Sequence, residues 1–207
     1  MTQVQDHPLP TPLIPEGGLF SPYASAIIRA SPSRIHSIII DTASYPKWNT
    51  FVPNATITKQ PNKPAIDSQL AMDTHMTLKG HMTESMPFAS KEIVSMLDEP
   101  KSGKGAVTRI CWKFHGGMLL PGMVMKAERV NEIEDLGDGT CEYRTWETFG
   151  GMTAHVVRWK YGKTLQERFE DWVRDLKAYA EGDEETLEAR KEEVKEQNTV
   201  VASTRLR

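Results

Sequence analysis

The sequence predicts a single α+β domain in which a long C-terminal helix closes a curved antiparallel sheet around an apolar cavity. Three observations support this prediction. Strand-like stretches follow one another between residues 68 and 149, separated by short turn-forming segments. Two short helical segments come before most of them, and a long amphipathic helix follows them. Because the strands are consecutive rather than alternating with helices, they pair antiparallel, which makes the fold α+β rather than α/β.

Composition excludes several classes of protein. A chain of 207 residues, 39% of them hydrophobic and 26% charged, can bury a core and is typical of a globular protein. The net charge of −3 gives no electrostatic reason to expect nucleic acid or an anionic membrane as partner. No apolar run approaches the roughly 20 residues that span a bilayer, and the start lacks the pattern of a secretory signal. We therefore expect a cytoplasmic protein without a transmembrane segment. Its two cysteines, Cys111 and Cys141, are expected in the core.

The chain divides into three expected parts. Residues 1–18 form a proline-rich, flexible N-terminal segment, residues 19–181 the ligand-binding domain and residues 182–207 a charged tail. In the tail, acidic residues outnumber basic ones and large apolar residues are few, so little surface is available to offset the cost of ordering. The tail is expected to be either a solvated helix extension or disordered.

The first elements are short. Residues 23–30 are a run of β-type residues. Ser31-Pro32 then begins a helix that reaches Ile40, since serine caps helices and proline is tolerated in their first turn. A second helical turn is expected at residues 45–49, where Pro46 stands near the start.

The strands that follow are identified by alternation. In residues 68–79, the large apolar residues share one parity, which indicates that one face is buried. An Asp-Gly pair at Asp138-Gly139 predicts a tight hairpin between the last two strands. About seven strands are expected in all; after the first one, the segments identified are residues 68–79, 90–97, 106–115, 125–134 and 140–149.

The last element is an amphipathic helix. Its apolar residues fall at steps of three and four, and the helix is expected to end near Ala180, before Gly182. It begins either at Thr164, where Glu167 completes a capping box, or near Thr153. The stripe consists of Leu165, Phe169, Trp172, Val173, Leu176 and Tyr179.

Several phrases of the sequence carry a resemblance to a known family. They are Ala30–Ile35, Tyr45–Pro53, Gly137–Thr140 with Glu147–Gly151, and Leu176–Glu181. Together they resemble the START-like, or SRPBCC, superfamily, which includes polyketide cyclases/dehydrases, lipid-transfer START domains and the birch-pollen allergen. The resemblance covers about residues 19–181 and implies a helix-grip fold with an internal cavity for a polyketide- or lipid-like molecule. Many relatives carry a histidine near the positions of Ala127 and Glu128, so chemistry assigned to that histidine does not transfer.

The candidate catalytic pair is Glu147 and Tyr143. They share strand parity with Phe149, and all three are expected on the concave face. A buried carboxylate beside a phenol can act as an acid or base, which suits enolisation or dehydration of a polyketide-like substrate. Arg109 is a candidate anion partner. The structural alternative is that Glu147 binds the backbone or an arginine at the end of the cavity.

Aromatic residues and methionines on the inner faces are the candidate ligand-binding residues. The loop at 116–122 is either a lid over the cavity or a plain connection. Trp48 and Trp112 can also be core residues. The candidates are Trp48, Met72, Met76, Trp112, Phe114, Phe149, Leu165, Phe169 and Trp172.

No metal or cofactor is expected. Asp73, His75 and His81 are of the types that bind metals, but Asp73 and His75 have the parity of the outer face. We therefore expect the protein to bind a small hydrophobic molecule, and one hypothesis is that it also catalyses the cyclisation or dehydration of this molecule. The alternative is a non-catalytic carrier or chaperone, and a third hypothesis is that the acidic tail binds a basic partner. The sequence does not distinguish these three hypotheses, and it does not determine the oligomeric state.

Overall fold

The structure is a computed structural model that describes residues 7–61, 68–83, 86–116 and 124–193. Most of the loop at 116–122, and the end of the charged tail, therefore lie outside the described residues. No helix within those ranges is long and apolar enough to cross a membrane.

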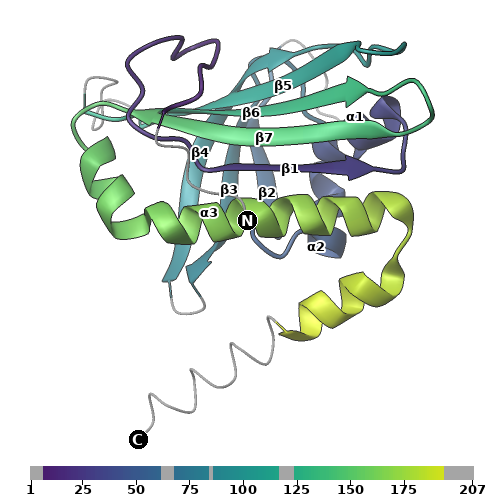
Figure 1. The fold of residues 1–207 in the computed structure, drawn as a ribbon. Coiled ribbons are helices and arrows are strands. Elements are labelled where there is room, and N and C mark those ends of the chain that lie inside the picture. The colour runs from purple at the N-terminus through teal and green to yellow at the C-terminus, as the bar shows by residue number, and fades with distance from the viewer. Residues whose placement is uncertain (1–6, 62–67, 84–85, 117–123, 194–207) are drawn as a thin grey trace, which may run out of the picture.

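Seven strands form one antiparallel sheet, as predicted, in the order β1-β7-β6-β5-β4-β3-β2 (Figure 1). From β2 to β7, each strand pairs with the next one along the chain, and β1 pairs with β7 at one edge of the sheet. The strands are β1 (Tyr23–Ile28), β2 (Asn54–Lys59), β3 (His75–Thr83), β4 (Met86–Leu97), β5 (Val107–Phe114), β6 (Lys126–Asp135) and β7 (Cys141–Gly150).

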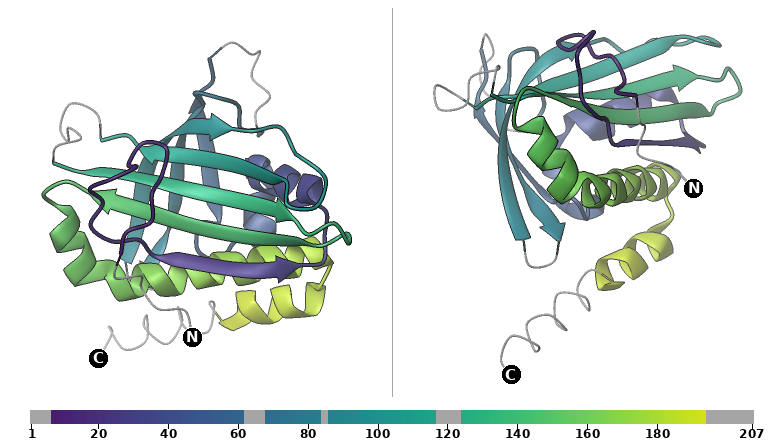
Figure 2. Two further views of the ribbon diagram at one scale, coloured as in Figure 1. Left: turned by 45° about the horizontal axis from the view of Figure 1, so that its top comes forward. Right: turned by 60° about the vertical axis from the view of Figure 1, so that its left-hand side comes forward.

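The sheet curves around one long helix, which confirms the helix-grip prediction (Figures 1 and 2). The short helices α1 and α2 lie at one end of this helix and complete the inner layer. Helix α1 begins with an exposed serine cap and a buried proline: the Ser31 hydroxyl accepts a hydrogen bond from the backbone N–H of Arg34, and Pro32 is the first helical residue. The helices are α1 (Pro32–Ile40), the 3-10 turn η1 (Thr42–Ser44), α2 (Tyr45–Trp48) and α3 (Ala154–Glu181).

The start of β3 differs from the sequence prediction. Residues 70–74 form a turn instead of a strand: Asp73 has a φ of 59°, and the Thr74 hydroxyl accepts a hydrogen bond of 3.0 Å from the Ala71 N–H. The turn interrupts the alternation, so Met76 is buried while Met72 is 47% exposed. The prediction of a continuous strand from residue 68 is therefore wrong.

Helix α3 begins at the earlier of the two predicted positions. Its first residue is Ala154, and Thr153 donates its hydroxyl to the Val124 carbonyl oxygen at 2.7 Å rather than capping the helix. Its end agrees with the sequence, because Gly182 adopts a left-handed conformation with a φ of 75° and donates its N–H to the last carbonyls. Compared with a start at Thr164, the helix has about three more turns, which lie along one end of the sheet.

Both flanking segments contact the domain. Residues 7–20 cross the outer face of the sheet, where the Thr148 hydroxyl donates to the Leu9 carbonyl oxygen at 2.6 Å (Figure 2). Residues 184–193 form a helix that turns back along α3 and buries Leu187. Arg190 in this helix donates hydrogen bonds to Asp171 at 2.6 Å and to Asp175 at 2.9 Å.

The two cysteines are buried and unpaired. Burial raises the pKa of the Cys111 thiol to about 12 and that of Cys141 to about 11. Both thiols therefore stay protonated at neutral pH, as expected for core residues rather than nucleophiles.

Candidate functional site

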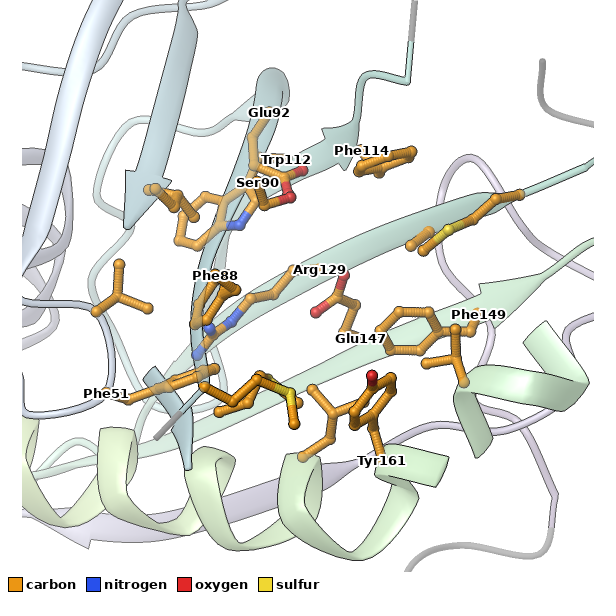
Figure 3. Close-up of a pocket in the computed structure, with 18 of the residues that line it drawn as sticks. Phe51, Phe88, Ser90, Glu92, Trp112, Phe114, Arg129, Glu147, Phe149 and Tyr161 are labelled. Atoms are coloured by element: carbon orange, nitrogen blue, oxygen red, sulfur yellow. The ribbon is translucent and has the colours of Figure 1, made fainter. Parts of the chain in front are cut away.

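A cavity of about 450 Å³ lies between the concave face of the sheet and the first turns of α3 (Figure 3). Its volume lies in the range of small-molecule sites, roughly 300–1,000 Å³. Most of its wall is apolar, which suits a hydrophobic ligand. The apolar lining includes Phe51, Leu78, Met82, Phe88, Trp112, Phe114, Met125, Phe149, Val157, Tyr161 and Leu165.

Four polar side chains interrupt this apolar wall: Ser90, Glu92, Arg129 and Glu147. Strand register brings them together. Arg129 on β6 lies directly opposite Glu147 on β7 and opposite Trp112 on β5. Figure 3 shows the carboxyl groups of Glu92 and Glu147 directed into the space between the sheet and Tyr161. The cavity therefore has one polar region within an apolar surround.

Arg129 is a buried cation held among aromatic rings. Its guanidinium carbon lies 4.0 Å from the ring centroid of Trp172 and 4.3 Å from that of Phe169. Its Nε donates a hydrogen bond of 3.2 Å to the Thr145 hydroxyl, whereas its Nη2 has no hydrogen-bond partner among the described residues. Burial lowers the pKa of Arg129, but an arginine stays protonated. The ring faces offset part of the cost of removing this charge from water.

Glu147 can both take and give a proton at neutral pH. Burial raises the pKa of its carboxyl to about 7, and the positive charge of Arg129 opposes the rise. A general acid–base group works best when its pKa lies near the operating pH. The carboxyl also stays partly accessible from the cavity. Position and protonation thus both suit proton transfer to a bound molecule.

Glu92 is the second carboxyl of the polar region. Burial raises its pKa well above the ordinary value, and the negative charge of Glu147 raises it further. The Ser90 hydroxyl, which hydrogen-bonds the carboxyl, and Arg129 oppose this rise. Since each carboxyl disfavours ionisation of the other, the two titrate as a pair. Glu92 is therefore the group that keeps its proton when Glu147 ionises.

Five of the predicted site residues line the cavity: Glu147, Trp112, Phe114, Phe149 and Leu165. Tyr143 does not lie in the wall. Its side chain is fully buried, and its hydroxyl donates to Asn131 Oδ1 at 2.7 Å and accepts from Trp172 Nε1 at 2.9 Å. The structure therefore does not bring Tyr143 and Glu147 together as an exposed acid–base pair.

The remaining predicted ligand-binding residues lie outside the cavity wall. Trp48 and Trp172 pack edge to face with ring centroids 5.1 Å apart, and Phe169 and Met76 are buried in the same core cluster. Met72 is exposed because the turn before β3 moves it out of the strand. These residues support the cavity from behind or lie away from it.

Two further candidates are placed on other surfaces. Arg109 pairs with Glu132 at 2.7 Å, and its side chain is 49% exposed, so it is not an anion partner within the cavity. The rings of His75 and His115 lie 5.5 Å apart. Among the described residues, no three His, Cys, Asp or Glu side chains come together as metal ligands.

Sequence reasoning missed Ser90, Glu92 and Arg129. The parity of residues 125–134 contained a signal, because Ala127, Arg129 and Ile133 alternate on one face. An arginine among inward-facing apolar residues is unusual enough to mark a site. Glu92 similarly shares its parity with Val94, which is fully buried.

Comparisons with known proteins show the family and the fold of the chain. No family model matches the chain. The oxopyrrolidines biosynthesis cluster protein O of Penicillium oxalicum is 32% identical over 190 residues, which cover 84% of this chain and 93% of that protein.

Solved structures match the fold. The hypothetical protein jhp0584 from Helicobacter pylori has a TM-score of 0.62 at 15% identity, covering 87% of this chain and 99% of that one. The major latex-like protein 151 from Panax ginseng has a TM-score of 0.58 at 10% identity, covering 77% and 96%. The chain therefore belongs to the family of the oxopyrrolidines biosynthesis cluster protein O, and its fold is the helix-grip fold of the START-like (SRPBCC) superfamily.

Proposed function

We propose that the protein binds a small hydrophobic, polyketide- or lipid-like molecule in the cavity and that Glu147 takes a proton from this molecule. The observation that supports this proposal is a carboxyl with a pKa of about 7 in the wall of an apolar cavity. The name of the Penicillium relative, which assigns it to a biosynthesis cluster, supports a role in making a small molecule. A cytoplasmic location and the absence of a nucleic-acid partner stay predictions.

The polar region suits a dehydration that leads to or follows cyclisation. The Glu147 carboxylate takes a proton from a carbon beside a carbonyl group, and the electron pair moves onto the carbonyl oxygen as an enolate. The positive charge of Arg129 favours this anion. The enolate then re-forms the carbonyl and expels the hydroxyl group of the β-carbon, and Glu92 gives its proton to this departing hydroxyl group. Water and a carbon–carbon double bond result, and the proton held by Glu147 passes to Glu92, directly or through solvent, which restores both carboxyls.

A carrier without chemistry is the second candidate. Its support is the predominance of apolar residues in the cavity wall, together with the position of Tyr143 outside it. Such a carrier needs the same cavity but not an ionisable Glu147. The two candidates therefore differ in what replacement of this one carboxyl does.

The test uses 1-tetralone, a hydrophobic ketone with exchangeable protons beside its carbonyl group. If Glu147 acts as a base, the protein accelerates exchange of these protons in heavy water near neutral pH, as followed by NMR. Glu147→Gln then loses the acceleration, while Glu188→Gln, at an exposed position, keeps it. Binding of 1-tetralone without accelerated exchange in the wild type would favour the carrier, and absence of binding would count against both candidates.

A further inference from the structure

Three large apolar side chains are exposed beside the first turns of α3. Met152 is 71% exposed, Val156 57% and Trp159 85%. Val156 and Trp159 are three residues apart and therefore share one helical face, and Met152 lies in the turn just before the helix. Large apolar side chains that gather on a surface mark sites of interaction with a protein or a membrane.

This face is the reverse of the cavity wall. Val157, Tyr161 and Leu165 line the cavity and follow one another at steps of four residues. Given about 100° of rotation per residue, the side chains of Val156 and Trp159 point to the opposite side of the helix. The same three turns of α3 thus carry the cavity wall on one side and the exposed apolar face on the other.

Basic residues surround the exposed apolar face. His155, Lys160 and Lys163 are exposed beside it, and the side chain of Lys163 is 92% exposed. No aspartate or glutamate occurs from Ala154 to Gln166. The first acidic residue is Glu167, which lies 3.9 Å from Lys163 in a solvent-exposed contact. Lys160 and Lys163 together outnumber this one carboxylate, so the face stays positive.

We propose that this face, formed by Met152, Val156, Trp159, Lys160 and Lys163, docks the protein onto an anionic lipid bilayer. Apolar side chains flanked by lysines are the pattern of a helix that lies in a membrane interface. Tryptophan favours that region because its ring is amphipathic, and lysine can reach the headgroups while its stem stays in the apolar layer. A second copy of the chain is disfavoured as occupant, because two such faces repel each other.

Docking of this kind would bring the cavity end of the domain to the phase in which a hydrophobic molecule dissolves. Only this consequence rests on the proposed function. The surface itself is argued from exposure and charge, so its test requires no ligand and no activity.

The test is co-sedimentation with vesicles of phosphatidylcholine alone and of phosphatidylcholine with phosphatidylserine. The wild type is expected to sediment with the anionic vesicles and to be released by salt. Trp159→Ser is expected to weaken binding about tenfold or more, and Lys163→Gln about fivefold. Lys47→Gln, at an exposed lysine on α2, is expected to have no effect on binding.

A matched pair separates this face from general surface hydrophobicity. Val156 and Ile27 are both 57% exposed, but Ile27 lies on β1, away from the apolar face. Val156→Ser is expected to weaken vesicle binding severalfold and Ile27→Ser to leave it unchanged, with circular dichroism confirming that both variants fold. Equal losses in the two variants, or no sedimentation with anionic vesicles, would overturn the proposal. So would a dimer in sedimentation velocity that Trp159→Ser abolishes, because a second copy would then cover the face.

Discussion

Arg129 and Glu147 lie directly opposite each other on β6 and β7, and both side chains line the apolar cavity. Their environment differs from that of a surface ion pair, because burial disfavours the charged form of each. Glu147 is consequently half-ionised near pH 7 instead of fully ionised. Glu147 can therefore exchange a proton near neutral pH, and the first two predictions concern this exchange.

The pH dependence of stability reports on Glu147. Its pKa is about 7 in the folded protein against an ordinary value of 4.5, so the folded state holds the proton more tightly than the unfolded state. The contribution of Glu147 is therefore fully present below about pH 4.5 and is lost as pH rises through about 7. The loss is on the order of 1–3 kcal/mol. Urea denaturation of the wild type and of Glu147→Gln across this range measures it as the difference between the two curves. Parallel curves would contradict the burial of Glu147.

Removal of the cation should raise the pKa of Glu147 further. In Arg129→Met, an uncharged side chain of similar length replaces the guanidinium whose positive charge opposes the effect of burial on the pKa of Glu147. Carboxyl titration followed by NMR is expected to show a higher pKa for Glu147 in this variant. Arg109→Met is the matched control, because Arg109 pairs with Glu132 outside the cavity and its loss leaves the titration unchanged. An unchanged pKa in Arg129→Met would show that the two groups do not interact.

Arg190 connects the C-terminal helix to the wall of the cavity. It donates to Asp175, whose other carboxylate oxygen accepts the backbone N–H of Thr50 at 2.8 Å, and Phe51 beside it lines the cavity. Asp175 is fully buried, so Arg190→Ala leaves a buried carboxylate without its cation. We expect a loss of about 3 kcal/mol in the free energy of unfolding.

The control for this change is Arg174→Ala, which removes a more exposed partner of Asp171. It is expected to cost less than about 1 kcal/mol. The division of the chain at residue 182 stays a prediction, and the same denaturation experiment bears on it. Equal, small losses in the two variants would indicate that residues 184–193 do not stabilise the domain.

Local patterns were sufficient to predict most of the fold. Alternation in 106–115, 125–134 and 140–149, with the Asp138-Gly139 turn, predicted β5 to β7 within about two residues of their observed ends. Alternation failed at residues 68–74. The apolar residues keep their alternating spacing there, but the positive φ of Asp73 and the hydrogen bond to the Thr74 hydroxyl make the backbone a turn instead of a strand. Periodicity also did not identify β2, whose residues alternate between partial and full exposure.

The site was less predictable, because it depends on which buried residues leave space between them. Parity placed Glu147 and Tyr143 on the same face, but packing filled the space around Tyr143 with Asn131 and Trp172. The role of Arg129 required knowledge of the three aromatic rings that two other elements, β5 and α3, bring to it. Likewise, the net charge of −3 concealed the basic character of the exposed face at Trp159, since charge summed over a chain carries no position.

The central claim is that the cavity holds a hydrophobic molecule, and native mass spectrometry of the freshly purified protein tests it most directly. The measurement compares the wild type with Ala127→Phe, which places a ring in the cavity wall at a position where a methyl group now stands. We predict that the wild type carries an added small-molecule mass, or takes up the apolar dye anilinonaphthalene sulfonate, and that the folded Ala127→Phe variant does neither. Equal binding by both proteins, or a wild type that binds neither, would contradict the claim.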